Sequence, residues 1–96
     1  MPRVATALPA RCESGGSRWE EQVLSLSENG CLIRSSEALL LGQRLQLELR
    51  LPQTEGIEVE AEATYQLLSD TGLVFNGLDA ESREGLGRFV AETILS

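Results

Sequence analysis

Hydrophobic and polar positions alternate strictly along two neighbouring segments in the middle of the chain. In residues 45–51 every odd position is apolar and every even position is polar, and residues 57–65 continue the same parity. An alternation with a period of two places one face of a strand on a core and the other face in water. Pro52 and the turn-forming residues after it separate the two segments, so the pattern predicts a β-hairpin with a loop over 52–56.

The charges on this hairpin help to predict its register. In one register Arg50 faces Glu58, which is a favourable cross-strand pair. The same register sets Glu48 against Glu60, which is unfavourable, so a pairing shifted by two residues is the alternative. We interpret the row formed by Glu58, Glu60 and Glu62 as a solvated strand face that keeps a sheet edge soluble, rather than as paired catalytic carboxylates.

Four further segments predict strands, at residues 4–12, 19–26, 31–33 and 73–75. Segments rich in glycine, serine and acidic residues separate them and predict turns at 13–17, 27–30 and 69–72. Pro9 lies in the first of these strands and implies a bulge or a position at a sheet edge. Val23 and Leu24 interrupt the alternation of the second strand.

The C-terminal segment changes from a period of two to the period of a helix. One helix face carries Leu86, Phe89, Val90, Thr93 and Ile94. Asp79 can cap the start of this helix. Gly85 and Gly87 each cost about 1 kcal/mol relative to alanine, so the helix needs to dock on the mouth or the side of the sheet structure. Six short strands followed by one helix predict an all-β fold with one helix, arranged as a small antiparallel barrel or sandwich.

The length and the charge limit the functions that this fold could serve. The chain has 96 residues, which suits a single domain over 1–96. It has 15 acidic residues and 8 basic residues, all arginine, and its net charge is −7. Such a charge argues against binding to a nucleic-acid polymer or to an anionic membrane. The longest apolar run has only four residues, so no membrane insertion is expected.

The same composition excludes several kinds of catalytic and metal site. The chain has no histidine, so it has no Ser-His-Asp or Cys-His pair and no imidazole ligand. Cys12 and Cys31 are too few for a thiolate zinc site, and we expect both to be buried small hydrophobes rather than a redox switch. We therefore expect no enzyme activity, no catalytic residues, no metal and no cofactor. Trp19, Phe75 and Phe89 are interpreted as core residues rather than as binding anchors.

The N-terminal third differs from the rest of the chain in its charge. Residues 1–36 hold four arginines and four glutamates, whereas residues 37–96 carry the whole excess of −7. An anion site is therefore expected in the N-terminal third. The first ten residues lack a continuous apolar core and make a poor signal peptide, which predicts a cytoplasmic protein with free thiols.

Three segments carry short motifs in an order that is typical of one family. Residues 25–33, Ser-Leu-Ser-Glu-Asn-Gly-Cys-Leu-Ile, resemble the D/N-x-S-x-x-G turn of the PilZ domain family and the short apolar strand after it. Residues 41–52 resemble its l-G-x-x-l-x-l-x-l-x-l-P strand, and residues 71–78 resemble its x-G-h-x-F-x-x-l strand, which a helix follows. The resemblance extends over residues 3–95.

The resemblance implies a six-stranded antiparallel PilZ-like β-barrel with a C-terminal α-helix, divided into an arm at 1–3, a barrel at 4–78 and a helix at 79–95. It also implies a bacterial cytoplasmic receptor for cyclic di-GMP, coupled to motility, pili, adhesion, biofilm or polysaccharide output. In this family an R-x-x-x-R arm clamps the phosphates of the ligand and stacks on its guanines, and the D/N-x-S-x-x-G turn reads guanine edges. Carried over to this sequence, the ligand-binding residues are Arg3, Ser25, Ser27 and Gly30.

The sequence departs from the family pattern at two positions. Arg3 aligns with the second arginine of the arm, and the first would fall before Met1. Ser25 stands where the motif has Asp or Asn, and a serine hydroxyl cannot reproduce the two-point acceptor geometry of a carboxylate. The two contacts concerned contribute roughly 3–6 kcal/mol together, which is two to four decades of affinity.

Two functions are compatible with this comparison. The first hypothesis is a protein-interaction adaptor in cyclic di-GMP-linked regulation, with weak or lost ligand binding and with an acidic strand face that suits a basic bacterial protein partner. The alternative is a functional receptor for cyclic di-GMP. The receptor would use Arg3 and the Ser25-x-Ser27-x-x-Gly30 turn, helped by Arg11, Arg18 or Arg34.

Overall fold

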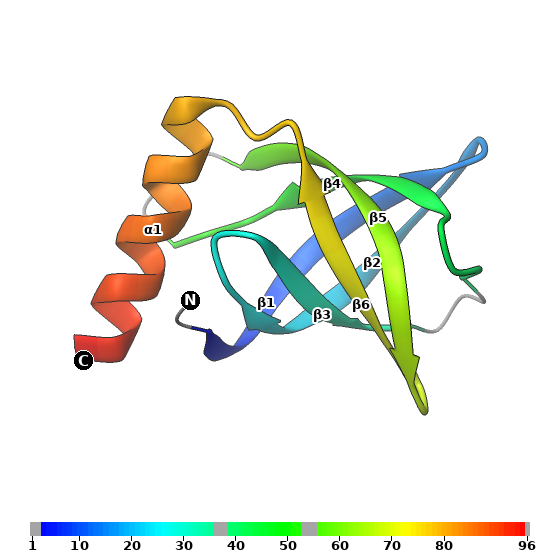
Figure 1. The fold of residues 1–96 in the computed structure, drawn as a ribbon, viewed down its shortest axis with the longest axis horizontal. Coiled ribbons are helices and arrows are strands. Elements are labelled where there is room, and N and C mark those ends of the chain that lie inside the picture. The colour runs from blue at the N-terminus through cyan, green and yellow to red at the C-terminus, as the bar shows by residue number, and fades with distance from the viewer. Residues whose placement is uncertain (1–2, 36–38, 53–55, 96) are drawn as a thin grey trace.

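Six antiparallel strands close into a barrel, and one helix follows them. In the computed structural model, the described residues 3–35, 39–52 and 56–95 form β1 (Val4–Ser14), β2 (Ser17–Leu26), β3 (Gly30–Arg34), β4 (Arg44–Leu49), β5 (Ile57–Leu67), β6 (Asp70–Asn76) and α1 (Ala80–Leu95). The strands pair in the order β1-β2-β3-β6-β5-β4, and β4 closes the barrel on β1. Figure 1 shows α1 beside one end of the barrel. The expected six-stranded antiparallel barrel with a C-terminal helix is confirmed.

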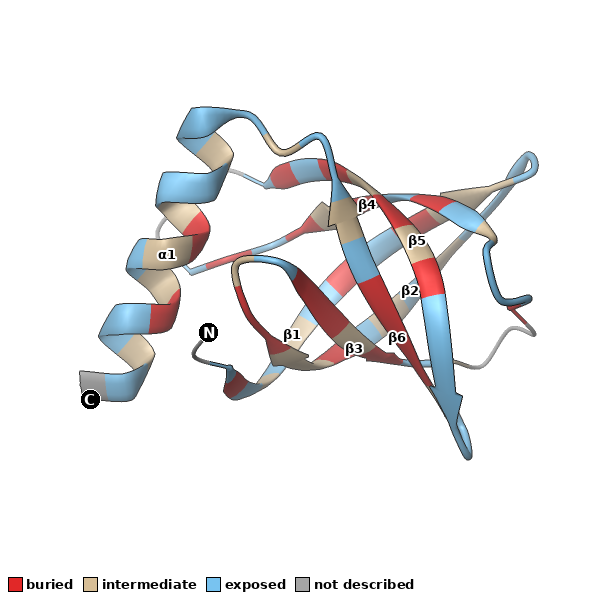
Figure 2. Ribbon diagram, viewed as in Figure 1, coloured by how far each residue is buried: buried red, intermediate tan, exposed pale blue. Residues whose placement is uncertain are grey.

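Alternating side chains build one apolar core inside the barrel. The three leucines of β4, Leu45, Leu47 and Leu49, are at most 2% exposed, and the odd positions at the start of β5 are buried with them. Figure 2 shows buried and exposed positions alternating along the strands. Helix α1 adds Leu86 and Val90 to this core. The buried faces predicted from the period-two pattern of residues 45–51 and 57–65 are therefore confirmed up to Ala63. Tyr65, predicted on the same face, is 44% exposed, because the register of β5 with β6 shifts between Ala63 and Tyr65.

The register of the β4–β5 hairpin is the one shifted by two residues. Glu48 faces Glu58, and Arg44 faces Glu62. The expected pairing of Arg50 with Glu58 was therefore wrong, and the Arg50 Nε instead lies 3.2 Å from the Glu48 Oε1 on the same side of the hairpin. Both registers would bury the same leucines. Because β4 also pairs with β1, closure of the barrel selects between the two registers. The repulsion between Glu48 and Glu58 is too small to outweigh the pairing of β4 with β1.

Strand β5 is not an edge strand. It pairs with β4 on one side and with β6 on the other, so the expectation that its glutamates keep an edge soluble was wrong. Glu60 and Glu62 lie 3.5 and 3.9 Å from the guanidinium of Arg44. Glu58 forms no ion pair with any residue that the structure describes. The glutamate row is thus divided into a paired part and an unpaired residue.

Two β-bulges explain the irregular positions of β1 and β2. The register between these strands shifts between residues 5 and 8, next to Pro9. The register between β2 and β3 shifts around Leu24. The bulge expected near Pro9 is confirmed, and the interrupted alternation at Val23 and Leu24 reflects the second bulge, because an inserted residue changes the face of every residue after it.

The two tight hairpin turns differ in their sequence signals. Gly15 and Gly16 form the β1–β2 turn with φ values of 57° and 83°, as two-residue hairpin turns require. The β5–β6 turn consists of Leu68 and Ser69, and the predicted turn over 69–72 was wrong because β6 already begins at Asp70. Leu68 adopts a φ of 51°, which is rare for leucine and which no glycine signals in the sequence.

Helix α1 begins as expected, and among its described side chains the buried ones lie in its central turns. The backbone N–H of Ser82 donates to the Asp79 Oδ1 at 2.7 Å, which confirms Asp79 as the N-cap. Leu86 and Val90 are buried, whereas Ile94, expected on the same face, is 54% exposed. The prediction for Ile94 was wrong because a straight helix beside the curved end of a barrel reaches the core over a limited length.

The Asp79 cap predicts an acid-sensitive contribution to stability. The backbone N–H and then the hydroxyl of Ser82 bond to the Asp79 carboxyl and lower its pKa. Because the folded pKa lies below the unfolded one, this contribution is complete above about pH 4 and is lost as the pH falls through the folded pKa. Replacing Asp79 by alanine should lower the Tm at pH 7 and flatten the dependence of Tm on pH below about pH 4.

Circular dichroism melts at a series of pH values check this prediction. The Asp79→Asn variant is the matched control, since asparagine is also a good N-cap but does not titrate. Its Tm at pH 7 should stay closer to that of the unmodified chain, with the same flattened dependence at low pH. An unchanged pH dependence in the alanine variant would show that Asp79 does not make this contribution.

Candidate functional site

The candidate ligand residues lie where the N-terminal end of β1 meets the β2–β3 turn. The β1–β2 ladder sets Ala5 opposite Ser25, so Arg3, which precedes β1, lies beside the end of β2. The Arg3 Nη1 donates a hydrogen bond of 2.9 Å to the Ser25 Oγ. The structure therefore brings Arg3 and Ser25 together on the exposed surface, although they are 22 positions apart in the sequence.

Ser27 is used inside the turn. It is 4% exposed, and its backbone N–H donates to the Gly30 carbonyl oxygen at 2.9 Å. Its hydroxyl oxygen accepts a bond of 3.3 Å from the Asn29 N–H and lies 3.4 Å from the same Gly30 oxygen. The Asn29 carbonyl accepts a bond of 2.8 Å from the N–H of Phe75, which ties the turn to β6. The Ser27 side chain thus closes the turn and has little surface left for a ligand.

Gly30 allows β3 to approach β6 closely. It lies opposite Val74 in the β3–β6 ladder and is buried. A Cβ atom at Gly30 would overlap the backbone carbonyl oxygen of Leu73. A glycine is required here by the closure of the barrel itself, whatever the turn binds.

The turn also contacts helix α1, which the sequence did not reveal. The Glu28 carboxylate lies so close to the backbone of Gly87 that a Cβ atom there would overlap the Glu28 Oε1. In the sequence Glu28 occupies a variable position of the turn motif, and Gly87 is recognisable only as an unfavourable residue in a helix. This contact could be predicted only with the knowledge that α1 packs next to the β2–β3 turn.

The other arginines of the N-terminal third do not gather around Arg3. Arg11 follows Arg3 by eight residues along β1, which is roughly 25 Å in an extended strand. The Arg18 Nε lies 3.0 Å from the Glu13 Oε2, across the β1–β2 hairpin. Arg34 is the last residue of β3, at the opposite end of that strand from the turn. Their suggested help in binding an anion therefore receives no geometric support.

Both cysteines are buried free thiols, as expected from the sequence. Burial, and to a smaller extent the charge of Glu21, raise the pKa of Cys12 to about 12. Burial, and then the neighbouring Cys12, raise the pKa of Cys31 to about 12. Such thiols are protonated at neutral pH and are poor nucleophiles. Trp19, Phe75 and Phe89 are partly buried and pack against the core, in line with their interpretation as core residues.

Neither a metal cluster nor a spanning helix is found in the part of the chain that the structure describes. No three histidine, cysteine, aspartate or glutamate side chains among these residues are arranged to hold a metal ion. Within the same residues, α1 is not long and apolar enough to cross a membrane.

Comparisons with known proteins agree with this fold. A model of the PilZ domain family matches residues 1–92. No curated protein matches the chain significantly. Among solved structures, the Bacillus subtilis inhibitor of motility MotI (DgrA) superposes with a TM-score of 0.86 at 18% identity, covering 98% of this chain and 50% of MotI.

Two further solved structures contain the dinucleotide. The PilZ domain of Escherichia coli YcgR with c-di-GMP superposes with a TM-score of 0.74 at 16% identity, covering 97% of this chain and 88% of that domain. The K. pneumonia MrkH–c-di-GMP complex gives a TM-score of 0.81 at 15% identity, covering 98% of this chain and 51% of MrkH. The chain thus spans about half the length of MotI and MrkH. At these identities the likeness to each structure concerns the fold.

Proposed function

The chain belongs to the PilZ domain family, and from this we propose that it is a bacterial protein-interaction adaptor in cyclic di-GMP-linked regulation of motility, pili or biofilm, with weak or lost binding of the dinucleotide. In this proposal the domain carries no catalytic residues and acts through contacts with a partner protein. The names of its structural neighbours support such a setting, since MotI is called an inhibitor of motility and the YcgR domain was solved with c-di-GMP.

One observation carries the proposal: the motif residues that remain serve the fold. Ser27 closes the β2–β3 turn, and Gly30 is backed by the Leu73 carbonyl oxygen. Ser25 is left to read a guanine edge, and its hydroxyl already accepts a hydrogen bond from Arg3. Guanine presents two adjacent N–H donors, and a hydroxyl cannot accept both as a carboxylate can. Loss of that pairing costs about 1–3 kcal/mol, which is roughly five-fold to 150-fold in affinity.

The receptor function remains the second candidate, because one contact favours it. The 2.9 Å bond between Arg3 and Ser25 places a guanidinium beside the turn, on an exposed surface. A guanidinium can hold a phosphate by a bidentate contact and stack on a guanine. The receptor would therefore bind cyclic di-GMP through Arg3, Ser25 and the backbone of the turn.

Isothermal titration calorimetry with cyclic di-GMP distinguishes the two functions. The unmodified chain should give no saturable heat up to about 100 µM ligand, because the expected Kd is about 1 mM or weaker. The Ser25→Asp variant should tighten binding by about ten-fold or more, because it restores the two-point acceptor. Ser17→Asp, at the far tip of the β1–β2 hairpin, is the control that adds the same charge elsewhere. Micromolar binding by the unmodified chain that Arg3→Ala abolishes would establish the receptor instead.

A further inference from the structure

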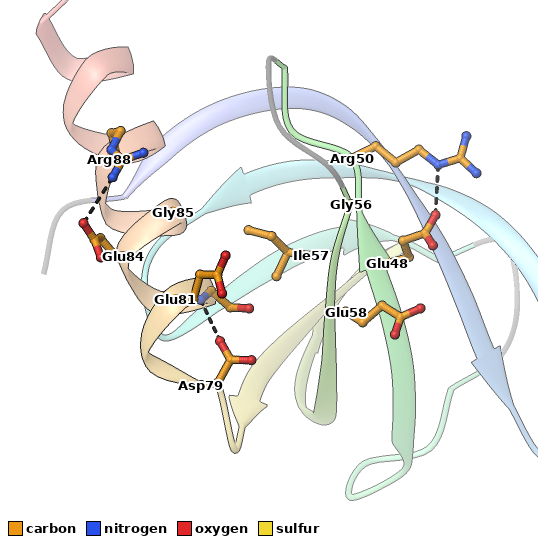
Figure 3. Close-up of a pocket in the computed structure, with 11 residues that line it drawn as sticks. Glu48, Arg50, Gly56, Ile57, Glu58, Asp79, Glu81, Glu84, Gly85 and Arg88 are labelled. Atoms are coloured by element: carbon orange, nitrogen blue, oxygen red, sulfur yellow. Dashed lines mark hydrogen bonds and ion pairs between the residues drawn. The ribbon is translucent and has the colours of Figure 1, made fainter.

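A groove separates the beginning of α1 from the ends of β4 and β5. Its volume is about 1020 Å³. We call it the rim groove, and its charged walls are formed by Glu48, Arg50, Glu58, Glu81, Glu84 and Arg88. Figure 3 shows the side chain of Ile57 lying between the two walls, with Glu48 and Glu58 on the barrel side and Glu81 and Glu84 on the helix side.

The rim groove carries more negative charge than it neutralises. Five carboxylates line it, counting Asp79, against two guanidinium groups. The two arginines are already engaged: Arg50 lies 3.2 Å from Glu48, and the Arg88 Nη2 lies 3.1 Å from the Glu84 Oε1. Of the other three carboxylates, Asp79 accepts a hydrogen bond from the Ser82 N–H. Glu58 and Glu81 are exposed and form no ion pair with any described residue.

Barrel closure holds two of these carboxylates in an unfavourable arrangement. Glu48 and Glu58 lie directly opposite each other in the β4–β5 ladder, and like charges at such positions repel. Arg50 turns toward Glu48, so the charge of Glu58 is left uncompensated. The register of the barrel fixes Glu48 opposite Glu58, so the chain itself cannot separate the two charges. A positive group bound in the groove would relieve their repulsion.

Ile57, a core residue that is 8% exposed, forms the floor of the rim groove together with Gly56 and Gly85. Gly56 and Gly85 contribute no side chains, and a Cβ atom at Gly85 would lie 3.6 Å from the Ile57 Cδ1, at ordinary contact distance. An apolar floor between acidic walls matches arginine and lysine side chains, whose aliphatic stems pack on apolar surface while their charged heads reach carboxylates. As noted above, no three carboxylates among the described residues are arranged around one metal ion. Carboxylates that are spaced apart along the groove match several cationic side chains of one bound segment.

From this combination we infer that the rim groove binds an arginine- or lysine-rich segment of the partner protein. The inference rests on the proposed adaptor function and specifies the surface that the adaptor uses. It also assigns partner binding to a different set of acidic residues from the glutamate row of β5 that the sequence suggests. Glu60 and Glu62 already pair with Arg44, whereas Glu58 faces the groove together with the carboxylates of α1.

A peptide of nine arginines is the probe for this surface, because the partner is unidentified. Its affinity is measured by fluorescence anisotropy for the unmodified chain and for two double variants of equal net charge. The groove variant is Glu58→Gln with Glu81→Gln. The control variant is Glu20→Gln with Glu92→Gln, which also changes one exposed strand residue and one exposed helix residue, both outside the groove lining.

The groove variant should bind the peptide at least ten-fold more weakly, and the control variant less than three-fold more weakly, because Coulomb interactions between charges in contact exceed those between distant screened ones. The Tm of the groove variant should be unchanged or higher, since Glu58→Gln removes a like-charge pair. Equal losses of affinity in both variants would overturn the inference.

This test is independent of the test of the proposed function. The calorimetric titration with cyclic di-GMP uses Arg3 and Ser25, which do not line the rim groove. Micromolar binding of the dinucleotide would refute the proposed loss of ligand binding. The comparison of the two double variants would still decide whether the groove binds basic segments. Conversely, equal losses of peptide affinity in the two double variants would refute the groove as a binding surface and would leave the result of the dinucleotide titration unchanged.

Discussion

Replacing Gly30 by alanine is expected to destabilise the barrel by about 3 kcal/mol or more. The added Cβ would overlap the Leu73 carbonyl oxygen, which is part of the backbone of β6 and cannot rotate away as a side chain would. Strands β3 and β6 would have to separate, and the ladder between Gly30 and Val74 would be strained. Urea denaturation followed by tryptophan fluorescence measures the change, because Trp19 packs against the core.

Gly85→Ala is the matched control for this substitution. Its Cβ would lie 3.6 Å from the Ile57 Cδ1, which is an ordinary contact, and alanine favours the helix. The control should therefore gain up to about 1 kcal/mol of stability. A Gly30→Ala variant as stable as the unmodified chain would show that the glycine is not required by the closure of the barrel.

Replacing Leu86 by alanine is expected to cost about 2–5 kcal/mol and to loosen α1. Leu86 is 0% exposed and, with Val90, anchors the helix in the core. The cavity left by the missing side chain would lie beneath the central turns of α1, where Phe89 and Val90 are the other apolar residues that pack on the core. Hydrogen exchange in α1 should then increase together with the loss of global stability.

Ile94→Ala removes a large aliphatic side chain from the same helix at an exposed position. Its effect on the free energy of unfolding should stay within about 0.5 kcal/mol, because surface positions contribute little. Comparable losses for Leu86→Ala and Ile94→Ala would contradict the limited docking length of α1. They would instead support the wider apolar face that the helical period predicts.

The local pattern of the sequence predicts strand identity and buried faces well, because alternation depends only on neighbouring residues. It does not determine the pairing of β4 with β5. Glu48 faces Glu58 because β4 must also pair with β1, and this second ladder joins segments more than thirty positions apart. The β5–β6 turn was misplaced for a different reason. Leu68 adopts a left-handed conformation that no local residue preference indicates.

The candidate site shows the same division. The hairpin pairing of β1 with β2 was foreseeable, and it places Arg3 beside Ser25. The structural role of Gly30 was not foreseeable, because it depends on β6 passing behind the turn, whereas Ser27 bonds locally to Asn29 and Gly30. The contact of Glu28 with Gly87 depends on where α1 returns to the barrel. A linear motif thus locates the turn, while long-range packing decides which of its residues face solvent.

A titration of the ¹⁵N-labelled chain with cyclic di-GMP, followed by heteronuclear NMR, tests directly whether the motif residues serve the fold rather than the ligand. The amide signals of Arg3, Ser25, Ser27 and Gly30 report on the turn and the arm separately from the rest of the barrel. These signals are expected to show no saturable shift up to about 1 mM ligand. Shifts of the same four signals that saturate in the micromolar range would contradict the loss of ligand binding and identify the turn as a working dinucleotide site.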